Sequence, residues 1–289
     1  MRVGVVDIGT NSMRLLVTDG HEEIGRWVEV TGLGRGVDAT GSLGADAVEE
    51  TIAVFSRFSE IMDLHGVAKR AAIATSATRD AANREEFMLR ASHALGVQPE
   101  VITGSREGRL AYAGATAGLD EGRYVVSDIG GGSSEFVTPD QSISIDIGSV
   151  RLTDRILIDR PPGDAQLDAA HSLVRELFSA IEMEGDLIGV AGTWTSLGAI
   201  DLELDVYDRN RVHHHAMTRG RLSSLAATLS RKTVEETAAI PSLDPARAPV
   251  ILAGAVVASG VMDAVGTETV LISEHDTLDG LAAELLAVT

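Results

Sequence analysis

The chain of 289 residues is long enough for two domains of ordinary size, and its 44% hydrophobic residues can fill a core. Its net charge of −19 argues against a protein that binds nucleic acid or anionic membranes non-specifically. The absence of cysteine excludes disulfide scaffolds, zinc fingers, Fe–S sites and thiol catalysis.

No segment of the sequence suits a membrane. The longest apolar stretch, Val250 to Met262, is shorter than the roughly 20 residues that a spanning helix needs. Arg2 and Asp7 interrupt the apolar start of the chain, so we expect no signal peptide. The sequence therefore predicts a soluble cytoplasmic protein without a membrane partner.

The first half of the chain contains both strand and helix signals. Val3–Asp7, Met13–Asp19 and Glu23–Thr31 predict three consecutive strands joined by turns. Apolar residues at three- and four-residue spacing predict a helix over Gly44–His65, and Gly66 is a suitable residue after its end. The next elements are predicted to be a strand at 70–75, a helix at 83–94, a strand at 100–102 and a helix capped by Thr103.

The second half repeats this order of signals. Val125–Val137 holds two strands around a glycine-rich turn, and Gln141–Ile147 predicts a third strand. Asp164–Glu182 has the pattern of an amphipathic helix. The remaining elements are predicted to be a strand at 187–191 that ends in a Gly192-Thr193 turn, and helices at 246–265 and 278–286.

An internal repeat relates the two halves. Val5–Val17 reads VVDIGTNSMRLLV, and Val125–Val137 reads VVSDIGGGSSEFV. Each copy has an apolar strand, Asp-Ile-Gly, a turn of small polar residues and a second apolar strand. The copies lie about one domain length apart, so they predict two duplicated α/β domains that face each other.

The first turn, Asp7–Ser12, has the chemistry of an anion-binding loop. Gly9 lets the backbone approach a ligand closely, and successive N–H groups of such a turn can surround an anion. Further donors come from the side chains of Thr10, Asn11 and Ser12. Asp7 can hold Mg²⁺ or its water ligands. For this copy alone, a plain hairpin turn is an equally good interpretation.

The second turn, Asp128–Ser133, contains the consecutive glycines Gly130, Gly131 and Gly132. Each glycine costs about 0.5–1 kcal/mol relative to alanine in a regular element, and a structural turn rarely needs three. Two such loops at strand ends in facing domains predict a two-sided phosphate clamp in preference to two unrelated turns.

These loops resemble those of the exopolyphosphatase/guanosine pentaphosphate phosphohydrolase (Ppx/GppA) family, a branch of the actin-like ATPase (ASKHA) superfamily. The loop motifs are DIGTNSMRL from Asp7 and DIGGGSSE from Asp128. Three further stretches agree with the family: ATSATRDAAN from Ala74, ITGSREGRL from Ile102 and GTWTSL from Gly192. The resemblance covers nearly the whole chain, which is similar to a short, two-domain form of the family.

The resemblance implies an α/β fold of two duplicated RNase H-like domains. Each domain is expected to have a mixed five-stranded sheet flanked by helices, with a cleft between the domains. The expected N-terminal domain covers residues 1–118 and is completed by a C-terminal helix at 278–289, and the second domain covers 119–277. A homodimer is implied as well, and the extra C-terminal helical domain of longer members is not expected.

The implied activity is Mg²⁺-dependent hydrolysis of the terminal phosphoanhydride of inorganic polyphosphate, with Mn²⁺ as the alternative metal. Guanosine pentaphosphate is the alternative substrate, because it presents the same terminal group to the same loops. A nucleotide-dependent kinase and a non-catalytic polyphosphate or nucleotide sensor are less favoured. The sequence contains no P-loop, H-E-x-x-H or G-x-S-x-G motif.

The resemblance also implies roles for single residues. Glu107 matches the catalytic glutamate that activates or orients water against the terminal phosphorus. Acidic positions near the metal match Asp7, Asp128 and Glu135. The residues expected to bind phosphate are Gly9, Thr10, Asn11, Ser12, Arg14, Arg79, Gly130, Gly131, Gly132 and Ser133.

Four other features are interpreted as structural. Arg106 stands where the family often has a further acid, and it either adds local positive charge or faces solvent. Arg109 and Arg151 are expected to be solvated surface charges. His213–His215 resembles a metal site, but alternate residues of an extended segment face opposite sides, so an ordinary loop or strand is favoured.

Overall fold

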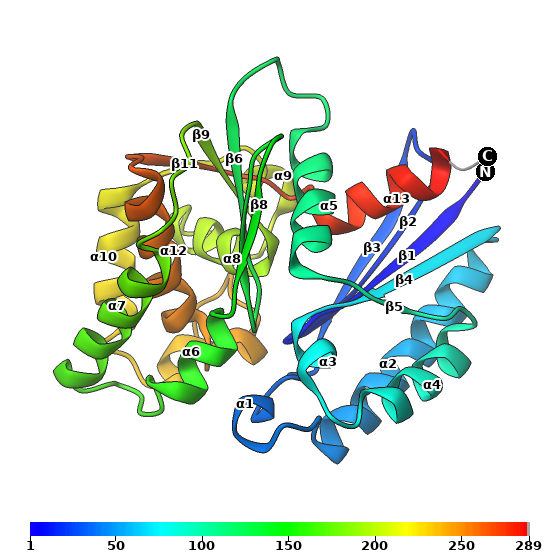
Figure 1. The fold of residues 1–289 in the computed structure, drawn as a ribbon, viewed down its shortest axis with the longest axis horizontal. Helices are drawn as coiled ribbons and strands as arrows, with labels where there is room; N and C mark the ends of the chain where they lie inside the picture. Colours follow the sequence, from blue (N-terminus) through cyan, green and yellow to red (C-terminus); the bar gives the residue numbers. More distant parts are fainter. Residues whose placement is uncertain (288–289) are drawn as a thin grey trace.

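The computed structural model of the protein describes residues 1–287, so the end of the helix predicted at 278–289 lies outside the described residues. Two mixed β-sheets with their helices form two lobes that lie side by side (Figure 1). The N-terminal lobe is built around the sheet of residues 3–101, and the C-terminal lobe around the sheet of residues 124–272.

The N-terminal lobe has a five-stranded sheet in the order β3-β2-β1-β4-β5. Its central strand β1 is antiparallel to β2 and parallel to β4, and all its residues are buried because helices cover both faces. The strands are β1 (Val3–Ile8), β2 (Ser12–Thr18), β3 (Glu23–Val30), β4 (Lys69–Ala74) and β5 (Glu100–Val101). The helices are α1 (Val37–Thr40), α2 (Ala45–Leu64), α3 (Ser76–Asp80) and α4 (Arg84–Leu95).

The C-terminal lobe repeats this arrangement in a six-stranded sheet with the order β10-β11-β9-β6-β7-β8. Here β6 is antiparallel to β7 and parallel to β9, as β1 is to β2 and β4. The strands are β6 (Tyr124–Ile129), β7 (Ser134–Val137), β8 (Ser142–Ile145), β9 (Asp186–Val190), β10 (Ala216–Thr218) and β11 (Thr269–Ile272). The larger helices are α6 (Ser149–Arg155), α7 (Asp164–Phe178), α8 (Ala191–Asp201), α10 (Arg219–Leu229) and α12 (Ile251–Val265), and the short ones are α9 (Arg209–Val212), α11 (Val234–Ala238) and a 3₁₀ turn at Pro245–Arg247.

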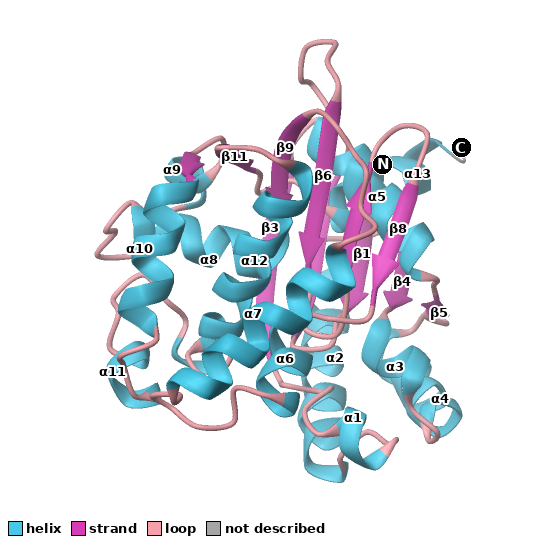
Figure 2. Cartoon of the chain, turned by 60° about the vertical axis from the view of Figure 1, so that its left-hand side comes forward, coloured by secondary structure: helices cyan, strands magenta, loops and turns pink. Residues whose placement is uncertain are grey.

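The helices separate the core into layers. Apolar residues of α2 and α4 cover one face of the first sheet. Helices α7, α8 and α12 cover the outer face of the second sheet, and Figure 2 shows α7 and α12 lying across it. The remaining faces of both sheets point toward the centre of the molecule.

Two helices, α5 (Gly104–Thr116) and α13 (Thr277–Ala287), fill this centre. Leu110 of α5 and Leu278 of α13 share a core with the first sheet, while Ala111 and Ala115 of α5 pack on the second sheet. Helix α5 therefore contacts both sheets, and α13 returns from the second sheet to pack on the first.

The predicted fold class and the repeat are confirmed, with several local differences. The second sheet has six strands rather than five, because the short β10 adds antiparallel to β11. The predicted Gly192-Thr193 turn lies in the first turn of α8. The helix predicted at 246–265 begins only at Ile251, because Pro245 and Pro249 break the preceding segment. The domain boundaries at 118 and 277 stay a prediction.

None of the helices within residues 1–287 combines the length and the apolar character that crossing a bilayer requires.

Candidate active site

Two loops with the same backbone geometry form the centre of the site. The first joins β1 to β2 and the second joins β6 to β7. The N–H of Gly9 donates to the carbonyl of Ser12 at 3.1 Å, and that of Gly130 donates to Ser133 at 3.0 Å. A Cβ at Gly9 would lie 2.8 Å from the Ser12 carbonyl oxygen, so this bend requires glycine.

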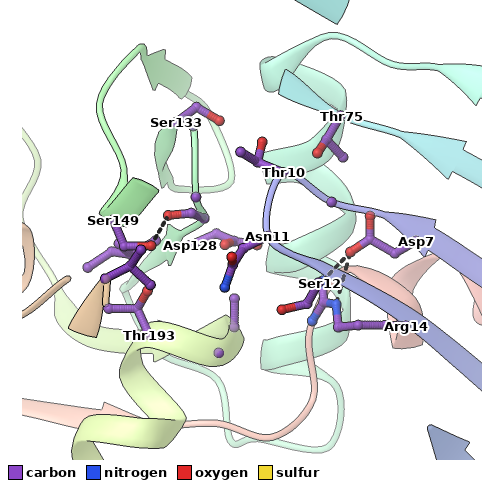
Figure 3. Close-up of a pocket in the computed structure, with 18 of the residues that line it drawn as sticks. Asp7, Thr10, Asn11, Ser12, Arg14, Thr75, Asp128, Ser133, Ser149 and Thr193 are labelled. Carbon is purple, nitrogen blue, oxygen red and sulfur yellow. Dashed lines mark hydrogen bonds and ion pairs between the residues drawn. The ribbon is translucent and has the colours of Figure 1, made fainter. Parts of the chain in front are cut away.

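The loops touch each other across the interface between the lobes (Figure 3). The side chain of Thr10 lies against the second loop, where a Cβ at Gly131 or Gly132 would come within 3.0 Å of it. A Cβ at Gly132 would also come within 2.5 Å of the Ser76 hydroxyl. The run of glycines therefore lets the two loops approach more closely than side chains would allow.

A pocket of about 60 Å³ lies between the loops. It brings together most of the residues that the sequence singled out. Those lining it are Asp7, Gly9, Thr10, Asn11, Ser12, Arg14, Glu107, Asp128, Gly130, Gly131, Gly132 and Ser133.

Three carboxylates, Asp7, Glu107 and Asp128, line this pocket, and a fourth, Glu135, lies behind it next to Asp128. Asp7 and Asp128 stand at equivalent places on β1 and β6, and Glu135 faces Asp128 across the β6–β7 ladder. Glu107 comes from the first turn of α5, which begins where the Thr103 hydroxyl accepts from the N–H of Arg106. All four are buried, and within the described residues one oxygen each of Asp7, Glu107 and Glu135 has no hydrogen-bond partner.

Burial raises the pKa of each of these acids. For Asp128 burial is the largest cause and outweighs the nearby Arg14, so its pKa rises to about 7. Burial and then the charge of Asp128 raise the pKa of Glu135 to about 8. The pKa of Glu107 lies well above its usual range because of burial, Glu135 and Asp128. Acids that repel one another in this way favour the binding of a proton or a cation.

Arg14 lies between two of the site's acids. Its Nε donates to Asp7 at 2.9 Å, and its Nη1 donates to Asp276, which immediately precedes α13. Burial lowers the pKa of the guanidinium, but the charges of Asp276 and Asp7 outweigh burial and raise it. A phosphate that bound Arg14 would therefore compete with carboxylates already in place.

Comparison with known proteins assigns the chain to a family. The Ppx/GppA phosphatase family profile matches residues 16–287. The chain belongs to the Ppx/GppA phosphatase family. Exopolyphosphatase 2 of Mycobacterium tuberculosis (strain CDC 1551 / Oshkosh) is 34% identical to it, over 98% of each chain.

Solved structures of the family agree with the fold described above. The Aquifex aeolicus member of the Ppx/GppA family is 32% identical, with a TM-score of 0.84 over 100% of this chain and 99% of that one. An exopolyphosphatase from Cytophaga hutchinsonii ATCC 33406 is 25% identical, with a TM-score of 0.91 over 100% and 99% of the chains. The predicted family is thereby confirmed, and the fold is that of its solved members.

Membership of a phosphatase family suggests a divalent metal in general, and the site residues fit one by their chemistry. Unpartnered carboxylate oxygens of Asp7, Glu107 and Glu135 are the hard donors that Mg²⁺ or Mn²⁺ takes. Within residues 1–287, however, no three His, Asp or Glu side chains form a ready set of ligands. The donors are thus suitable in kind, and the assignment of Asp7, Asp128 and Glu135 to a metal stays a prediction.

The remaining predicted residues lie around the pocket. Arg79 lies beside it, where its Nη1 donates to the carbonyl of Ile102 at 3.1 Å and its charge lowers the pKa of Glu107. Arg106 forms a two-pronged ion pair with Glu284 of α13, which ties α5 to α13. Arg109 is exposed, as expected.

The interpretation of Arg151 as a solvated charge was wrong. Its side chain is only 10% exposed because it reaches from the C-terminal lobe to acids of the N-terminal lobe. It pairs with Asp80 at 2.5 Å and with Asp38 at 3.4 Å. The histidines of the predicted loop lie between α9 and β10, where His215 pairs with Asp201 at 2.8 Å.

Sequence reasoning missed a cation at the far wall of the pocket. The guanidinium of Arg247 lies on Gly192, where a Cβ would be 2.0 Å from Nη1, and its Nη2 donates to the Ser12 hydroxyl at 3.3 Å. Ala191 adopts a left-handed conformation (φ 67°) just before Gly192, which is uncommon for a residue with a Cβ. The left-handed Ala191 brings the start of α8 to the pocket, and the missing side chain of Gly192 leaves room there for the buried guanidinium of Arg247.

A second, larger cavity adjoins the first. Its volume is about 530 Å³, and Arg14, Gly192 and Arg247 line both cavities. Its mouth carries apolar side chains from both lobes, including the exposed Val28 and Tyr207. The pocket between the loops therefore adjoins a space with mixed apolar and basic walls.

Proposed function

We propose that this protein is an exopolyphosphatase, which hydrolyses the terminal phosphoanhydride of inorganic polyphosphate and releases orthophosphate. The observation that carries the proposal is the contact between two equivalent Asp-Ile-Gly loops over a small pocket lined by buried acids. The names of the relatives in M. tuberculosis and C. hutchinsonii support it.

The size of the pocket favours attack at the end of a chain. A volume of about 60 Å³ is room for roughly four to five water-sized groups, which is about one phosphoryl group with an attacking water. In our proposal the loop N–H groups of residues 10–12 and 131–133 surround that group, because those of Gly9 and Gly130 already donate within their own loops. Arg79 and Arg14 add positive charge at its edge.

Glu107 is proposed to act on the attacking water. The water oxygen forms a bond to the terminal phosphorus, the bond from phosphorus to the bridging oxygen breaks, and the bridging oxygen keeps the electron pair. Glu107 accepts the proton that the water loses. Its raised pKa makes the ionised carboxylate a stronger base, and its place in the first turn of α5 fixes its direction.

Mg²⁺, with Mn²⁺ as the alternative, would be held by Asp7, Asp128 and Glu135, and when bound it would offset negative charge on the transferred group. The protein itself contributes positioning and preorganised donors, which provide most of the rate in phosphoryl transfer. The two loops belong to different lobes, so closure of the lobes completes the set of donors.

The proposal is tested by Glu107→Gln, which keeps the shape of the side chain but removes its basicity. We expect kcat for polyphosphate to fall by about 10²–10⁴-fold, because general base catalysis contributes that much, with binding largely unchanged. Glu100→Gln, at an exposed acid on the neighbouring β5, is the matched control. Near-normal turnover of Glu107→Gln would remove Glu107 from its role.

Guanosine pentaphosphate is the second candidate substrate, and the adjoining cavity favours it. An apolar wall beside basic residues suits a nucleoside that trails behind the terminal phosphate. Phosphate release from polyphosphates of defined length is to be compared with release from guanosine pentaphosphate. A higher kcat/KM for the nucleotide would reverse our order of preference, and phosphate release without ADP formation would exclude a kinase.

A homodimer is proposed from family resemblance, and light scattering on the purified protein tests it.

A further inference from the structure

The start of α13 reaches both acids near the ends of the repeated strands, Asp7 through Arg14 and Asp128 directly. The carboxylate of Asp276 accepts from Nη1 of Arg14, whose Nε donates to Asp7 at 2.9 Å. The hydroxyl of the next residue, Thr277, donates to Oδ2 of Asp128 at 3.3 Å. Both residues are almost completely buried. Two consecutive residues thus contact one loop through Arg14 and the other through Asp128.

The backbone around these residues is held in place by its own contacts. Oδ1 of Asp276 accepts from the N–H of Leu278 at 2.9 Å, and Oδ2 of Asp279 accepts from the N–H of Asp276 at 2.8 Å, so the two carboxylates cap the helix. The carbonyl of Asp276 lies against Gly114 of α5, where a Cβ would come within 2.0 Å of it. The segment is therefore fixed to the helix that carries Glu107.

We propose that Asp276 and Thr277 are positioning residues for the hydrolysis: Asp276 holds the guanidinium of Arg14, and Thr277 holds the carboxylate of Asp128, in the places that the terminal phosphate requires. This inference rests on the proposed function. It makes α13 the element that relates the first loop to the second, since the two loops belong to different lobes and α13 contacts residues of both.

A purely structural role for Asp276 is the competing explanation, because the residue is also a helix cap. The two roles use different oxygens: Oδ1 caps the helix, and Oδ2 accepts from Arg14. Asp276→Asn separates them, since an asparagine oxygen caps a helix about as well while its amide nitrogen cannot accept from arginine. Asp279→Asn is the matched control on the same turn: asparagine keeps an oxygen that can accept from the N–H of Asp276, and the residue loses only its ion pair with Arg26 and does not contact Arg14.

For Asp276→Asn we expect both kinetic constants for polyphosphate to fall, KM less than kcat. Arg14 loses a competing carboxylate, so the ground state binds phosphate more tightly and KM falls about 3- to 10-fold. The guanidinium also loses its fixed direction, so kcat falls about 10- to 100-fold, as misplacement of a contacting group predicts. Asp279→Asn is expected to leave both constants within about 2-fold of the wild type, with a similar melting temperature.

Thr277 is tested by a pair of variants that differ in one hydroxyl. Thr277→Val has nearly the same shape but cannot donate to Asp128, and we expect kcat to fall about 10-fold with KM unchanged. Thr277→Ser keeps the hydroxyl and should restore most of the loss. A structural role would make serine, which removes a buried methyl group, at least as damaging as valine.

The outcomes separate this inference from the proposed function. If the wild type releases no phosphate from polyphosphate or guanosine pentaphosphate, the proposed function fails. If the wild type is active and Asp276→Asn matches it in kcat and KM, Asp276 is only a cap. Should Asp276→Asn fail to fold, the Thr277 pair decides, and equal activities of the valine and serine variants would overturn the inference.

Discussion

Glu135 is a carboxylic acid with no exposed surface, next to Asp128 on the neighbouring strand. Ser144 donates to its Oε1 at 2.7 Å, while its Oε2 has no partner within the described residues. Burial and then the charge of Asp128 raise its pKa to about 8. The folded state therefore binds this proton more tightly than the unfolded state does. The stability it contributes is present in full below about pH 4.5 and is lost as the pH rises to about 8.

Glu135→Gln should remove this pH dependence, because glutamine keeps the shape without ionising. We expect the free energy of unfolding of the wild type to fall by about 2–4 kcal/mol between pH 5 and pH 8, at roughly 1.4 kcal/mol per pKa unit with allowance for relaxation. The free energy of unfolding of Glu135→Gln should fall clearly less than that of the wild type over the same pH range. Urea denaturation at both pH values, without divalent ions, measures this, with the exposed Glu60→Gln as control. Equal losses in the wild type and the variant would contradict the prediction.

The residues that the sequence could predict are those whose chemistry lies within one short segment. Asp7, Asp128 and the glycines repeat in two loops, so one copy supports the interpretation of the other. Arg247 and Asp276 do not lie in a recognisable motif. Each contributes to the site through a contact with a residue more than 230 positions away in the sequence. The same limit explains why Arg151, which pairs with the other lobe, looked like a surface charge.

At the scale of elements, the close contact of α5 with α13 depends on small residues. A Cβ at Gly280 would lie 2.1 Å from the carbonyl oxygen of Leu110, a backbone atom that cannot turn aside. We expect Gly280→Ala to lower the free energy of unfolding by about 1–3 kcal/mol through overpacking, and to lower kcat by moving α13 away from the loops. Thermal unfolding and polyphosphate turnover measure the two effects.

Gly220→Ala in α10 is the control for this exchange. A Cβ at Gly220 meets no atom within 4 Å, so alanine should stabilise that helix by about 0.5–1 kcal/mol through its better propensity. We therefore expect the free energy of unfolding to fall in Gly280→Ala and to rise in Gly220→Ala. A Gly280→Ala protein as stable as Gly220→Ala would show that α13 is free to shift.

The elements that the sequence predicted well are long and periodic. The helix predicted over 44–65 is observed as α2, Ala45–Leu64. It could be predicted because its apolar residues recur at the spacing that places them on one buried face of a helix. The sixth strand β10 has only three residues and one buried side chain, so its sequence is too short to show the alternation of apolar and polar residues that predicts a strand. The start of α8 depends on the left-handed Ala191, a conformation that its residue type does not suggest.

For the whole molecule, the main question is what keeps the two lobes closed over the pocket, given a net charge of −19 and a substrate that is itself an anion. Besides the contact of the loops, a cluster of charges joins the lobes at α1 and α6. Asp38 of α1 pairs with Arg155 at 3.0 Å and with Arg151 at 3.4 Å, and the N–H of Gly36 donates to Asp154 at 2.9 Å. We call Asp38, Arg151 and Arg155 the inter-lobe ion-pair cluster.

Asp38→Asn should weaken the inter-lobe ion-pair cluster and so lower the population of the closed form. Partly exposed ion pairs contribute about 0.2–1 kcal/mol each, so the loss of two should shift the balance of open and closed forms by about 5-fold and raise KM for polyphosphate about 2- to 5-fold. Salt screens such pairs, so the difference from the wild type should shrink between about 0.05 and 0.5 M salt. Asp63→Asn breaks the Asp63–Arg70 pair within the N-terminal lobe and should leave KM unchanged at every salt concentration. If Asp38→Asn behaves as this control does, the charges at α1 and α6 contribute nothing to the population that binds substrate, and closure is set by the other contacts between the lobes, such as those of the loops, of Arg247 with Ser12 and of Arg209 with Glu23.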